Sequence, residues 1–559
     1  MSRAALSHKS CPVCQWDRLI YAFATSGGAF YKCAGCGIFL CDPTRSHTEQ
    51  KAIDFWSKEQ RANSSALDEA EKKHYLDMLQ RHVPKGKLLE IGCGKGDFLL
   101  EARSRGFEVA GLEGNRALAD MAAAIIGRDA INCAENIEGV YEKGSFDVVV
   151  LFDLMGIFSN PIAIMRYVHE ILRPNGLFVF CVPLADSRAA ALLRQEWVEF
   201  NKRQSVLFDA NSVQNALFLA GFDRSLLVRH PRQVSLDWLR KYLEQFQLRW
   251  GGRLAARMIT IFPRGLRQIS FQVAGGHGVV MSHAKPLKSE HVLSIIIPVF
   301  NERSSFAELI ETVLAKEIPG LKKEIIIVES NSTDGSREEV LRFQDRPEVQ
   351  VILQDKPRGK GHAVRAGLAE ATGDYVLIQD ADLEYDINDY DALLEPLITG
   401  REAFVLGSRH GGSNIWKMRK FNEQHGLAFF VNFGHWIFLT LLNALFLQRL
   451  RDPFTMFKVF RRDCLHGLEF KCDRFDFDFE ILIKLIRKGY RPIELPVNYR
   501  ARSFKEGKKV RLFRDPITWL RALIWLRFVK IDPAEVVERT RHVEPMKTAK
   551  DPAKPFINK

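Results

Sequence analysis

Residues 374–384 read DYVLIQDADLE, an apolar run that is followed by three acidic side chains at alternate positions. The run has the length and composition of a buried β-strand, and the acidic residues begin where the run ends. In an extended segment alternate side chains project to the same side, so Asp380, Asp382 and Glu384 are expected to converge on one hard cation, Mg2+ or Mn2+. The stretch therefore predicts a strand that ends at a metal site.

Similar apolar runs lie on both sides of this strand and alternate with helical stretches over residues 292–535. Such alternation predicts an α/β domain built on a parallel sheet. The ends of the runs carry residues that suit a nucleoside diphosphate. They are Pro298, Phe300 and Glu302 around the base, Glu329 at the end of the next strand, and Lys360 of the RGKG loop together with Asp380 at the diphosphate.

Further motifs follow in order: GSR (407–409), RDPFTMFKVFRRD (451–463) and FDFDFEILIKLIRKGY (475–490). With them, residues 293–530 resemble the family 2 glycosyltransferases of the GT-A fold, most closely the polyprenol-phosphate (dolichol-phosphate) mannose synthase type. The resemblance implies inverting transfer from a nucleoside diphosphate sugar to a polyprenyl phosphate, with Asp382 in the catalytic centre and Arg409 binding the acceptor phosphate. Charge complementarity adds Arg500 and Arg502 to that phosphate site.

A lipid phosphate is already ionised and needs no general base, whereas a sugar hydroxyl does. The alternative acceptor is such a hydroxyl, on a glycan in cell-surface polysaccharide assembly, and for it Glu480 or Asp478 is the candidate base. Two residues depart from the family: Glu329 replaces the more usual Asp, and Glu384 replaces the Gln common in the synthases. Both substitutions keep an oxygen ligand, and neither the sugar nor the base of the donor is indicated.

A second α/β alternation covers residues 46–275. Its first strand ends in a glycine-rich turn, where a ligand can approach the backbone and the N-terminus of a helix. The turn contains Glu90, Gly92, Gly94 and Gly96. Glu113 ends the next strand, where an acidic side chain can accept both ribose hydroxyls of a nucleoside.

From KLLEIGCGKGDF through FDVVVLFDLM to ILRPNGLFVFCVP, this half resembles the Rossmann-like class I S-adenosylmethionine-dependent methyltransferases. The resemblance implies that the same residues bind S-adenosylmethionine, with Phe152 and Asp153 lining the pocket. Many relatives carry a catalytic His where this chain has Ile157. The half is therefore either an active methyltransferase or a non-catalytic binding module, and His169 is expected to be an ordinary surface or core histidine.

Two CxxC pairs open the chain, Cys11 with Cys14 and Cys33 with Cys36, separated by 18 residues. This spacing predicts a zinc ribbon over residues 1–45, and four protein ligands make the zinc structural. No basic and aromatic stripe surrounds the pairs, so no nucleic-acid partner is expected. The other six cysteines are scattered, which is typical of a reducing compartment.

The overall composition and the segments outside the domains complete the predicted domain organisation. The chain has 559 residues, of which 46% are hydrophobic and 26% charged, which excludes a wholly disordered or fibrous protein. Residues 276–291 are predicted to be a linker and residues 536–559 a disordered tail. The beginning of the chain lacks an apolar signal region, so a cytoplasmic location is expected.

The net charge is +12, and residues 491–530 hold eleven Lys or Arg against three Asp or Glu. Residues 426–447 contain no charged side chain and are long enough to span a membrane. A crossing would divide the second α/β domain. Helical spacing also places four polar residues in one stripe, and these are His425, Asn432, His435 and Asn443. An interfacial helix is therefore favoured over a core helix, with the protein peripherally bound to the membrane.

Overall fold

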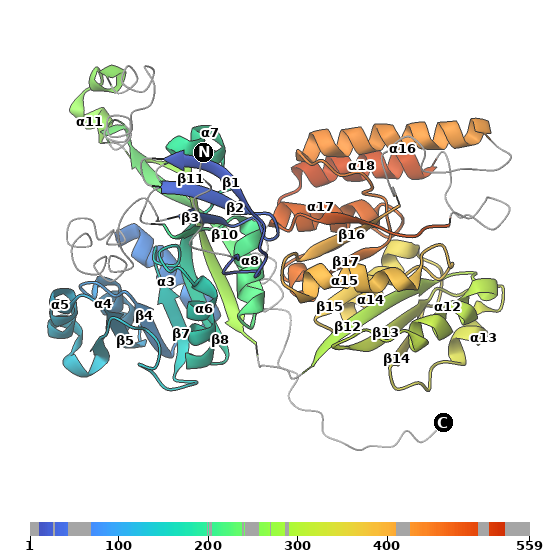
Figure 1. Cartoon of the computed structure of the whole chain (residues 1–559), viewed down its shortest axis with the longest axis horizontal. Coiled ribbons are helices and arrows are strands. Elements are labelled where there is room, and N and C mark those ends of the chain that lie inside the picture. Colours follow the sequence, from blue (N-terminus) through green and yellow to red (C-terminus); the bar gives the residue numbers. More distant parts are fainter. Residues whose placement is uncertain are drawn as a thin grey trace.

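The computed structural model describes residues 10–25, 28–42, 69–197, 199–200, 204–237, 240, 257–268, 270–285, 290–409, 425–500 and 514–531. These residues form two α/β halves, with a small three-stranded unit that lies on the first half (Figure 1). The predicted tail, residues 536–559, lies outside the described residues, as does Arg502.

The small unit consists of three antiparallel strands that extend onto the first half. Its elements are β1 (Leu19–Thr25), β2 (Gly28–Cys33) and β3 (Phe39–Asp42). Strand β3 pairs with β9 (Val206–Leu207), and the buried side chains of the unit share one hydrophobic core with the first half. The unit is therefore built onto the first half and is not a separate module.

The first half has a seven-stranded sheet in the order β10-β11-β8-β7-β4-β5-β6. Its strands are β4 (Lys87–Ile91), β5 (Glu108–Glu113), β6 (Ile131–Cys133), β7 (Phe146–Leu151), β8 (Leu172–Pro183), β10 (Phe222–Ser235) and β11 (Ser270–Ala284). Its helices are α3 (Glu69–His82), α4 (Asp97–Ser104), α5 (Arg116–Ile126), α6 (Pro161–Ile171), α7 (Arg188–Leu193), α8 (Ala210–Leu219) and α11 (Arg264–Arg267). Strands β4 to β8 are parallel, whereas β10 and β11 are antiparallel additions at one edge.

The second half has another seven-stranded sheet, in the order β14-β13-β12-β15-β17-β16-β18. Its strands are β12 (His291–Val299), β13 (Leu321–Glu329), β14 (Val349–Leu353), β15 (Tyr375–Ile378), β16 (Phe404–Ser408), β17 (Lys458–Arg461) and β18 (Ile493–Pro496). Its helices are α12 (Arg303–Ala315), α13 (Ser336–Leu341), α14 (Lys360–Glu370), α15 (Tyr390–Ile398), α16 (His425–Phe446), α17 (Phe477–Lys488) and α18 (Arg514–Phe528). Short 3-10 turns in the chain are η2 (Arg128–Ala130), η3 (Arg194–Glu196), η4 (Ile387–Asp389) and η5 (Arg462–Leu465).

Helices cover both faces of the parallel part of this second sheet, so its central strands are apolar on both faces. Ile295, Ile296 and Ile297 of β12, for example, have no solvent exposure. The α/β class and the two parallel sheets predicted from the sequence are confirmed. The strand predicted from DYVLIQ is β15, and it pairs in parallel with β12.

The predicted linker over residues 276–291 is wrong for most of its length. Residues 276–284 belong to β11, which pairs with both β10 and β8. The glycines that suggested a linker serve close packing, because a side chain at Gly276 would meet Trp197 and one at Gly278 would meet Leu184. Only residues 285–290 separate β11 from β12, and residues 286–289 lie outside the described residues.

Among the described residues, no helix combines the length and the apolar character needed to cross a membrane. Helix α16 lies beside α18, with the rings of Phe438 and Trp519 5.7 Å apart (Figure 1). Of the predicted polar stripe, the structure describes the side-chain surroundings of His435 and Asn443, and both of these side chains face the domain. His435 packs against Phe454, and Asn443 bonds the backbone of Leu450.

Candidate functional sites

The carboxyl ends of three adjacent parallel strands, β13, β12 and β15, form the candidate site of the second half. Val299 pairs with Glu329, and Ile296 pairs with Ile378, so the residues that follow these strands lie side by side. Phe300 and Asp380 are therefore brought to the same edge as Glu329. Ligands of open α/β sheets bind at this edge, and the predicted donor-binding residues do meet there.

Glu302 and Glu329 are both buried and held by their surroundings. The backbone N–H of Glu302 donates to Ser336, and its carboxylate accepts from Ser305 at 3.3 Å. Glu329 has no exposure, and its carboxylate accepts from the backbone N–H of Ser332 at 2.6 Å and from Arg337 Nε at 2.5 Å. The carboxylate expected to meet the base is thus already fixed in orientation.

The segment DADLE is a tight turn and not the extended strand that the sequence suggested. Leu383 has φ 54°, which reverses the chain after Asp382. Asp380 forms an ion pair with Lys360, whereas Glu384 accepts a hydrogen bond from the Tyr499 hydroxyl at 2.6 Å. Among the described residues, these three carboxylates do not gather closely enough to form a preassembled cluster. The expected geometry is therefore wrong, although Asp380 and Asp382 remain hard oxygen ligands that suit Mg2+ or Mn2+.

A buried cluster of charges lies beside this turn, and sequence reasoning assigned no role to two of its members, Lys458 and Asp452. Lys458 has no exposure and its Nζ lies 3.8 Å from Asp478 Oδ1. Burial lowers the pKa of Lys458, against the opposing effect of Asp478. The signal in the sequence was a single Lys within the apolar run MFKVF. A charge in such a run has to find a partner in the core.

Arg409 follows β16 and is held by Asp452. Asp452 Oδ2 accepts from the backbone N–H of Arg409 at 2.9 Å and from its Nε at 2.8 Å, and Oδ1 accepts from Nη2 at 2.6 Å. Burial alone would raise the pKa of Asp452, but the charge and hydrogen bonds of Arg409 outweigh it and hold that pKa below its usual range. The guanidinium also lies over the Tyr499 ring, 5.3 Å from its centroid.

The two candidate bases, Glu480 and Asp478, have different surroundings. Glu480 is fully buried and accepts from the backbone N–H groups of Lys471 and Cys472 and from Lys484 Nζ, so it anchors a loop. Asp478 instead faces Lys458, and burial raises its pKa, which the charges of Lys458 and Lys360 oppose. Of the predicted acceptor cations, Arg500 is exposed, and its backbone N–H donates to Glu384 O at 2.8 Å.

The first half presents a second candidate site, in the glycine-rich turn at the end of β4. Gly92, Gly94 and Gly96 all have positive φ, at 80°, 54° and 85°. A side chain added at Gly94 would meet no atom within 4 Å, so the turn borders open space. Gly94 N donates to Glu113 Oε2 at 2.9 Å, which ties the turn to the end of β5.

Two buried carboxyl groups lie under this turn. Burial, with the nearby Glu113 and Asp97, raises the pKa of Glu90 to about 8, and its Oε2 has no hydrogen-bond partner among the described residues. Burial also raises the pKa of Glu113. An orphaned acidic oxygen beside open glycine backbone suits a ligand that carries positive charge, such as S-adenosylmethionine.

The next strand end, after β7, carries Phe152 and Asp153. The Phe152 ring stacks on Tyr75 of α3, with the centroids 5.0 Å apart. Asp153 has φ 55°, an uncommon backbone conformation for a residue other than glycine. Ile157 packs against the hydrophobic core, so no imidazole occupies its position.

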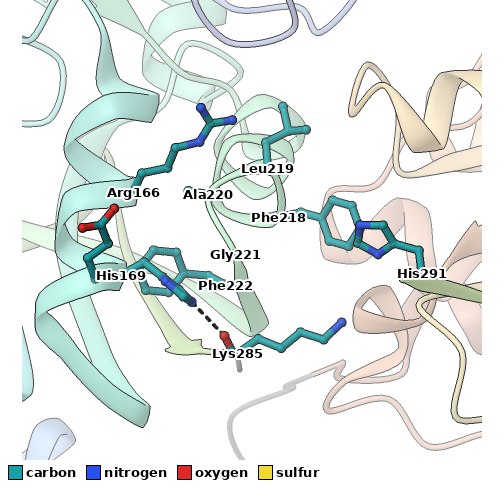
Figure 2. A pocket seen from close by; sticks show the side chains of 10 residues that line it. Arg166, His169, Phe218, Leu219, Ala220, Gly221, Phe222, Lys285 and His291 are labelled. Atoms are coloured by element: carbon teal, nitrogen blue, oxygen red, sulfur yellow. Dashed lines mark hydrogen bonds between the residues drawn. The ribbon is translucent and has the colours of Figure 1, made fainter. Parts of the chain in front are cut away.

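His169 lies away from the glycine-rich turn, at the junction between the halves. Its Nε2 is 2.8 Å from Lys285 O, and its ring packs against Phe222 (Figure 2). These residues, together with Phe218 and His291, line a cavity of about 280 Å3. The expectation of an ordinary histidine agrees with this position.

The four predicted cysteines meet in the small unit. Cys11 Sγ lies 3.6 Å from Cys36 Sγ and Cys14 Sγ lies 3.5 Å from Cys33 Sγ, and all four sulfur atoms lie within 4.8 Å of one another. A tetrahedral zinc ion with Zn–S bonds of about 2.3 Å requires S–S separations of about 3.8 Å, so the group fits this ion. All four cysteines are buried.

Comparison with known proteins supports the interpretation of both halves. Residues 294–468 match the family model "Glycosyl transferase family 2", and residues 55–225 match the model "Methyltransferase domain". The chain therefore contains a family 2 glycosyltransferase domain and a methyltransferase domain, and both resemblances drawn from the sequence are confirmed.

Individual relatives cover the glycosyltransferase half. A dolichol-phosphate mannosyltransferase of Pyrococcus furiosus is 28% identical over 219 residues, which are 39% of this chain and 58% of that protein. A dolichyl-phosphate beta-glucosyltransferase of Saccharomyces cerevisiae is 27% identical over 292 residues, which are 48% of this chain and 84% of that protein. Among solved structures, glucosyl-3-phosphoglycerate synthase from Mycobacterium tuberculosis is 21% identical, covers 43% of this chain and 81% of its own, and gives a TM-score of 0.33.

Proposed function

We propose that the C-terminal domain transfers a sugar from a nucleoside diphosphate sugar to a polyprenyl phosphate. The observation that carries this proposal is the arrangement of Arg409, which Asp452 holds rigidly beside the DADLE turn. A phosphate acceptor needs fixed cations, and the Nη1 atom of Arg409 makes no hydrogen bond to the described residues. The names of the relatives in Pyrococcus and Saccharomyces support the same class of acceptor.

In this mechanism an oxygen of the lipid phosphate attacks the anomeric carbon as the bond to the nucleoside diphosphate breaks. A single displacement inverts the configuration at that carbon. Lys360 stays protonated, because the nearby Asp380 and Asp478 outweigh the effect of burial and raise its pKa. Its ammonium is placed to neutralise the leaving diphosphate. A divalent ion bound by Asp380 and Asp382 would supply further charge stabilisation there.

The acceptor is a lipid, so the site has to lie near a membrane surface. Helices α16 and α18 expose large apolar side chains: Trp436 and Ile437 on α16, with Leu447 directly after it, and Leu520, Ile524 and Phe528 on α18. Arg521 and Arg527 are exposed among the latter. Apolar and cationic side chains on one face suit the interface of an anionic bilayer, and we assign this surface to peripheral binding at the cytoplasmic membrane face.

The N-terminal domain is proposed to bind S-adenosylmethionine, which supplies an electrophilic methyl group. Glu90, Glu113 and the three glycines would hold it, and the small unit would carry a structural zinc. Asp153 would lie next to the methyl acceptor, because it follows β7 beside the cofactor strand β4. A carboxylate there could accept the proton of the methyl acceptor, which the apolar side chain of Ile157 cannot do.

Purified protein with Mn2+ or Mg2+, polyprenyl phosphate and labelled GDP- or UDP-sugars tests the main proposal. Label in the organic phase that is lost in Asp382→Asn is the expected result. Donor hydrolysis that depends on Asp382, with no labelled lipid, would move the acceptor to a glycan hydroxyl. No reaction with any donor would contradict the proposal.

A further inference from the structure

The two domains meet through helix α8 of the methyltransferase domain, whose polar side chains enter the glycosyltransferase domain. Asn211 Nδ2 donates to Glu402 Oε2 at 3.2 Å, and Asn215 Nδ2 donates to Arg401 O at 3.0 Å. Asn215 has no solvent exposure. The contact is also close along the backbone, since a side chain at Gly400 would collide with Leu219.

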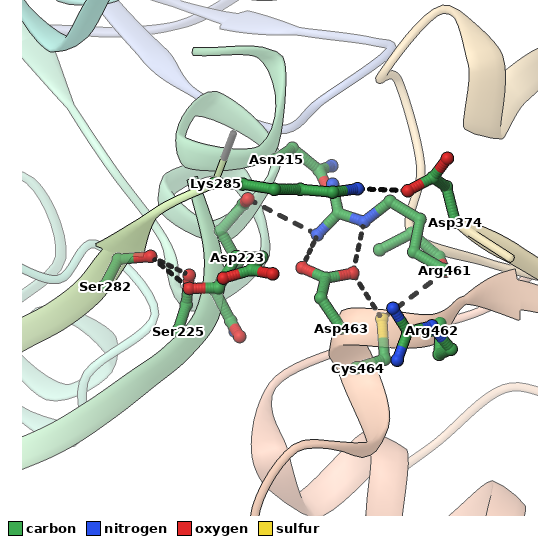
Figure 3. Close-up of polar contacts among 12 residues, drawn as sticks. Asn215, Asp223, Ser225, Ser282, Lys285, Asp374, Arg461, Arg462, Asp463 and Cys464 are labelled. Atoms are coloured by element: carbon green, nitrogen blue, oxygen red, sulfur yellow. Dashed lines mark hydrogen bonds and ion pairs between the residues drawn. The ribbon is translucent and has the colours of Figure 1, made fainter. Parts of the chain in front are cut away.

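Arg461 is the central residue of this interface. It lies at the end of β17, has no exposure, and donates from Nη1 to Asn215 Oδ1 at 3.1 Å and from Nη2 to the backbone O of Gln214 at 3.3 Å (Figure 3). Its guanidinium lies 4.2 Å from the centroid of the Phe218 ring. Asp463 supplies the counter-charge, with its Oδ1 3.1 Å from Arg461 Nε. Without α8 this buried cation would keep Asp463 and lose its other polar and aromatic partners.

The elements that α8 contacts also carry the acceptor side of the sugar-transfer site. Residues 400–402 lead into β16, which ends next to Arg409. Arg461 ends β17, and Lys458 begins it, about 10 Å away along three residues of strand. Asp478 lies in the first turn of α17, and Gly489 caps the other end of this helix. That end packs closely on α8, because a side chain at Gly489 would lie 2.9 Å from Ala210 Cβ. The strand β13, which carries Glu329 at the donor side, is separated from β17 by β12 and β15 in the order of the sheet.

We propose that the methyltransferase domain has a second role that is independent of methyl transfer: helix α8 is a positioning element of the sugar-transfer site. Through Asn215 and Arg461 it fixes β16 and β17, and so the placement of Arg409 and Lys458 on the acceptor side. Arg461 is a positioning residue, because it lies in the interface between the domains and acts through the strand that carries Lys458. This inference rests on the proposed function, which gives Arg409 its role.

The test uses the full-length chain and an assay without S-adenosylmethionine. Asn215→Leu keeps the branched shape of the side chain and removes both hydrogen bonds that Asn215 makes across the interface. We expect kcat over KM for polyprenyl phosphate to fall at least tenfold, while the affinity for UDP or GDP with Mn2+, measured by calorimetry, changes less than twofold. A general loss of folding would lower both quantities. Gln350→Ala, which removes an exposed hydrogen bond to Glu370, is the matched control.

A variant that combines Asn215→Leu with Arg461→Met guards against misfolding. Because Arg461→Met leaves the buried carboxylate of Asp463 without its counter-charge, Asp463→Asn is added, and this triple variant should recover part of the lost activity and most of the melting temperature. Normal acceptor kinetics in Asn215→Leu, or an equal loss of nucleotide affinity, would overturn the proposal.

Hydrogen exchange separates this inference from the proposed function. In Asn215→Leu, amides of residues 404–409 and 458–461 should exchange at least tenfold faster, and those of residues 321–329 should not. If the wild-type protein transfers no sugar but this pattern appears, the proposed function fails and the positioning role stands. If exchange in the two strands is unchanged, the positioning role fails whatever the activity.

Discussion

Asp452 holds Arg409 at three points, through the backbone N–H, Nε and Nη2 of the arginine. The pair is buried, with Asp452 fully inaccessible, so water cannot replace either partner. A cation fixed in this way loses little further freedom when an anionic acceptor arrives. The pair therefore prepares the acceptor site before the acceptor binds.

Asp452→Asn should weaken binding of the acceptor phosphate. The amide keeps the size of the side chain but removes the charge that orients Arg409, and breaking a buried ion pair costs about 3–5 kcal/mol. We expect the KM for polyprenyl phosphate to rise at least tenfold, with the KM for the donor little changed. Asp391→Asn, which affects an exposed partner of Lys316, is the control, and a normal acceptor KM in Asp452→Asn would refute the assignment.

Divalent ions should tighten nucleotide binding through Asp382. In the wild-type protein, Mn2+ should raise the affinity for the donor nucleoside diphosphate at least tenfold, because the ion bridges carboxylate and diphosphate. Calorimetry with and without Mn2+ should show this gain lost in Asp382→Asn. Glu384→Gln is the matched control, since its amide oxygen can still accept from Tyr499. An undiminished Mn2+ effect in Asp382→Asn would place the ion elsewhere.

The sequence predicted the two sheets and the ends of the strands well, because buried parallel strands are continuous apolar runs. Glu90, Glu113, Glu329 and Asp380 all lie where a run was expected to end. The four cysteines could also be grouped, since the spacing of two CxxC pairs constrains the fold directly.

What could not be predicted depended on long-range partners. The positive φ of Leu383 turns the DADLE segment, and the hydroxyl of Tyr499, more than a hundred residues away, donates a hydrogen bond to Glu384. Glu480 and Asp478 are neighbours on one helix, and only the loop at Lys471 decides which of them is used as an anchor. The pairing of Arg461 with Asn215 crosses two domains, and no local pattern marks it.

Loss of one cysteine should remove the zinc and loosen the small unit. The core of the unit is continuous with that of the methyltransferase domain, so Cys14→Ser should lower the melting temperature as well as the metal content. One zinc per chain by atomic spectroscopy is expected for the wild-type protein and much less for the variant. Cys133→Ser, at an exposed cysteine, should change neither quantity. A metal-free wild-type protein of full stability would contradict the assignment.

The exposed face of α16 and α18 should bind anionic vesicles. Ile524 and Phe528 are 49% and 81% exposed, so acidic residues at these positions are tolerated by the fold but repelled by an anionic surface. Ile524→Glu with Phe528→Glu should lower vesicle binding at least tenfold in sedimentation. Leu353→Glu, at a leucine of β14 that is 46% exposed and so comparable with Ile524, is the control. An equal loss of vesicle binding in the α18 double variant and in Leu353→Glu would argue against this face as the membrane-binding surface.

Binding of S-adenosylmethionine should depend on pH through Glu90. Its pKa is raised to about 8 in the empty protein, chiefly by burial, so the carboxyl is mostly protonated at pH 7. A ligand with sulfonium and ammonium charges favours the ionised form, and binding must then release a proton. Affinity should therefore rise as the pH increases from 6 to 8 and level off above 8. Calorimetry in buffers of different ionisation enthalpy would measure the released proton, and Glu90→Gln should flatten the profile. Proton uptake by the wild-type protein, or a pH dependence that survives in Glu90→Gln, would exclude this carboxyl as the titrating group.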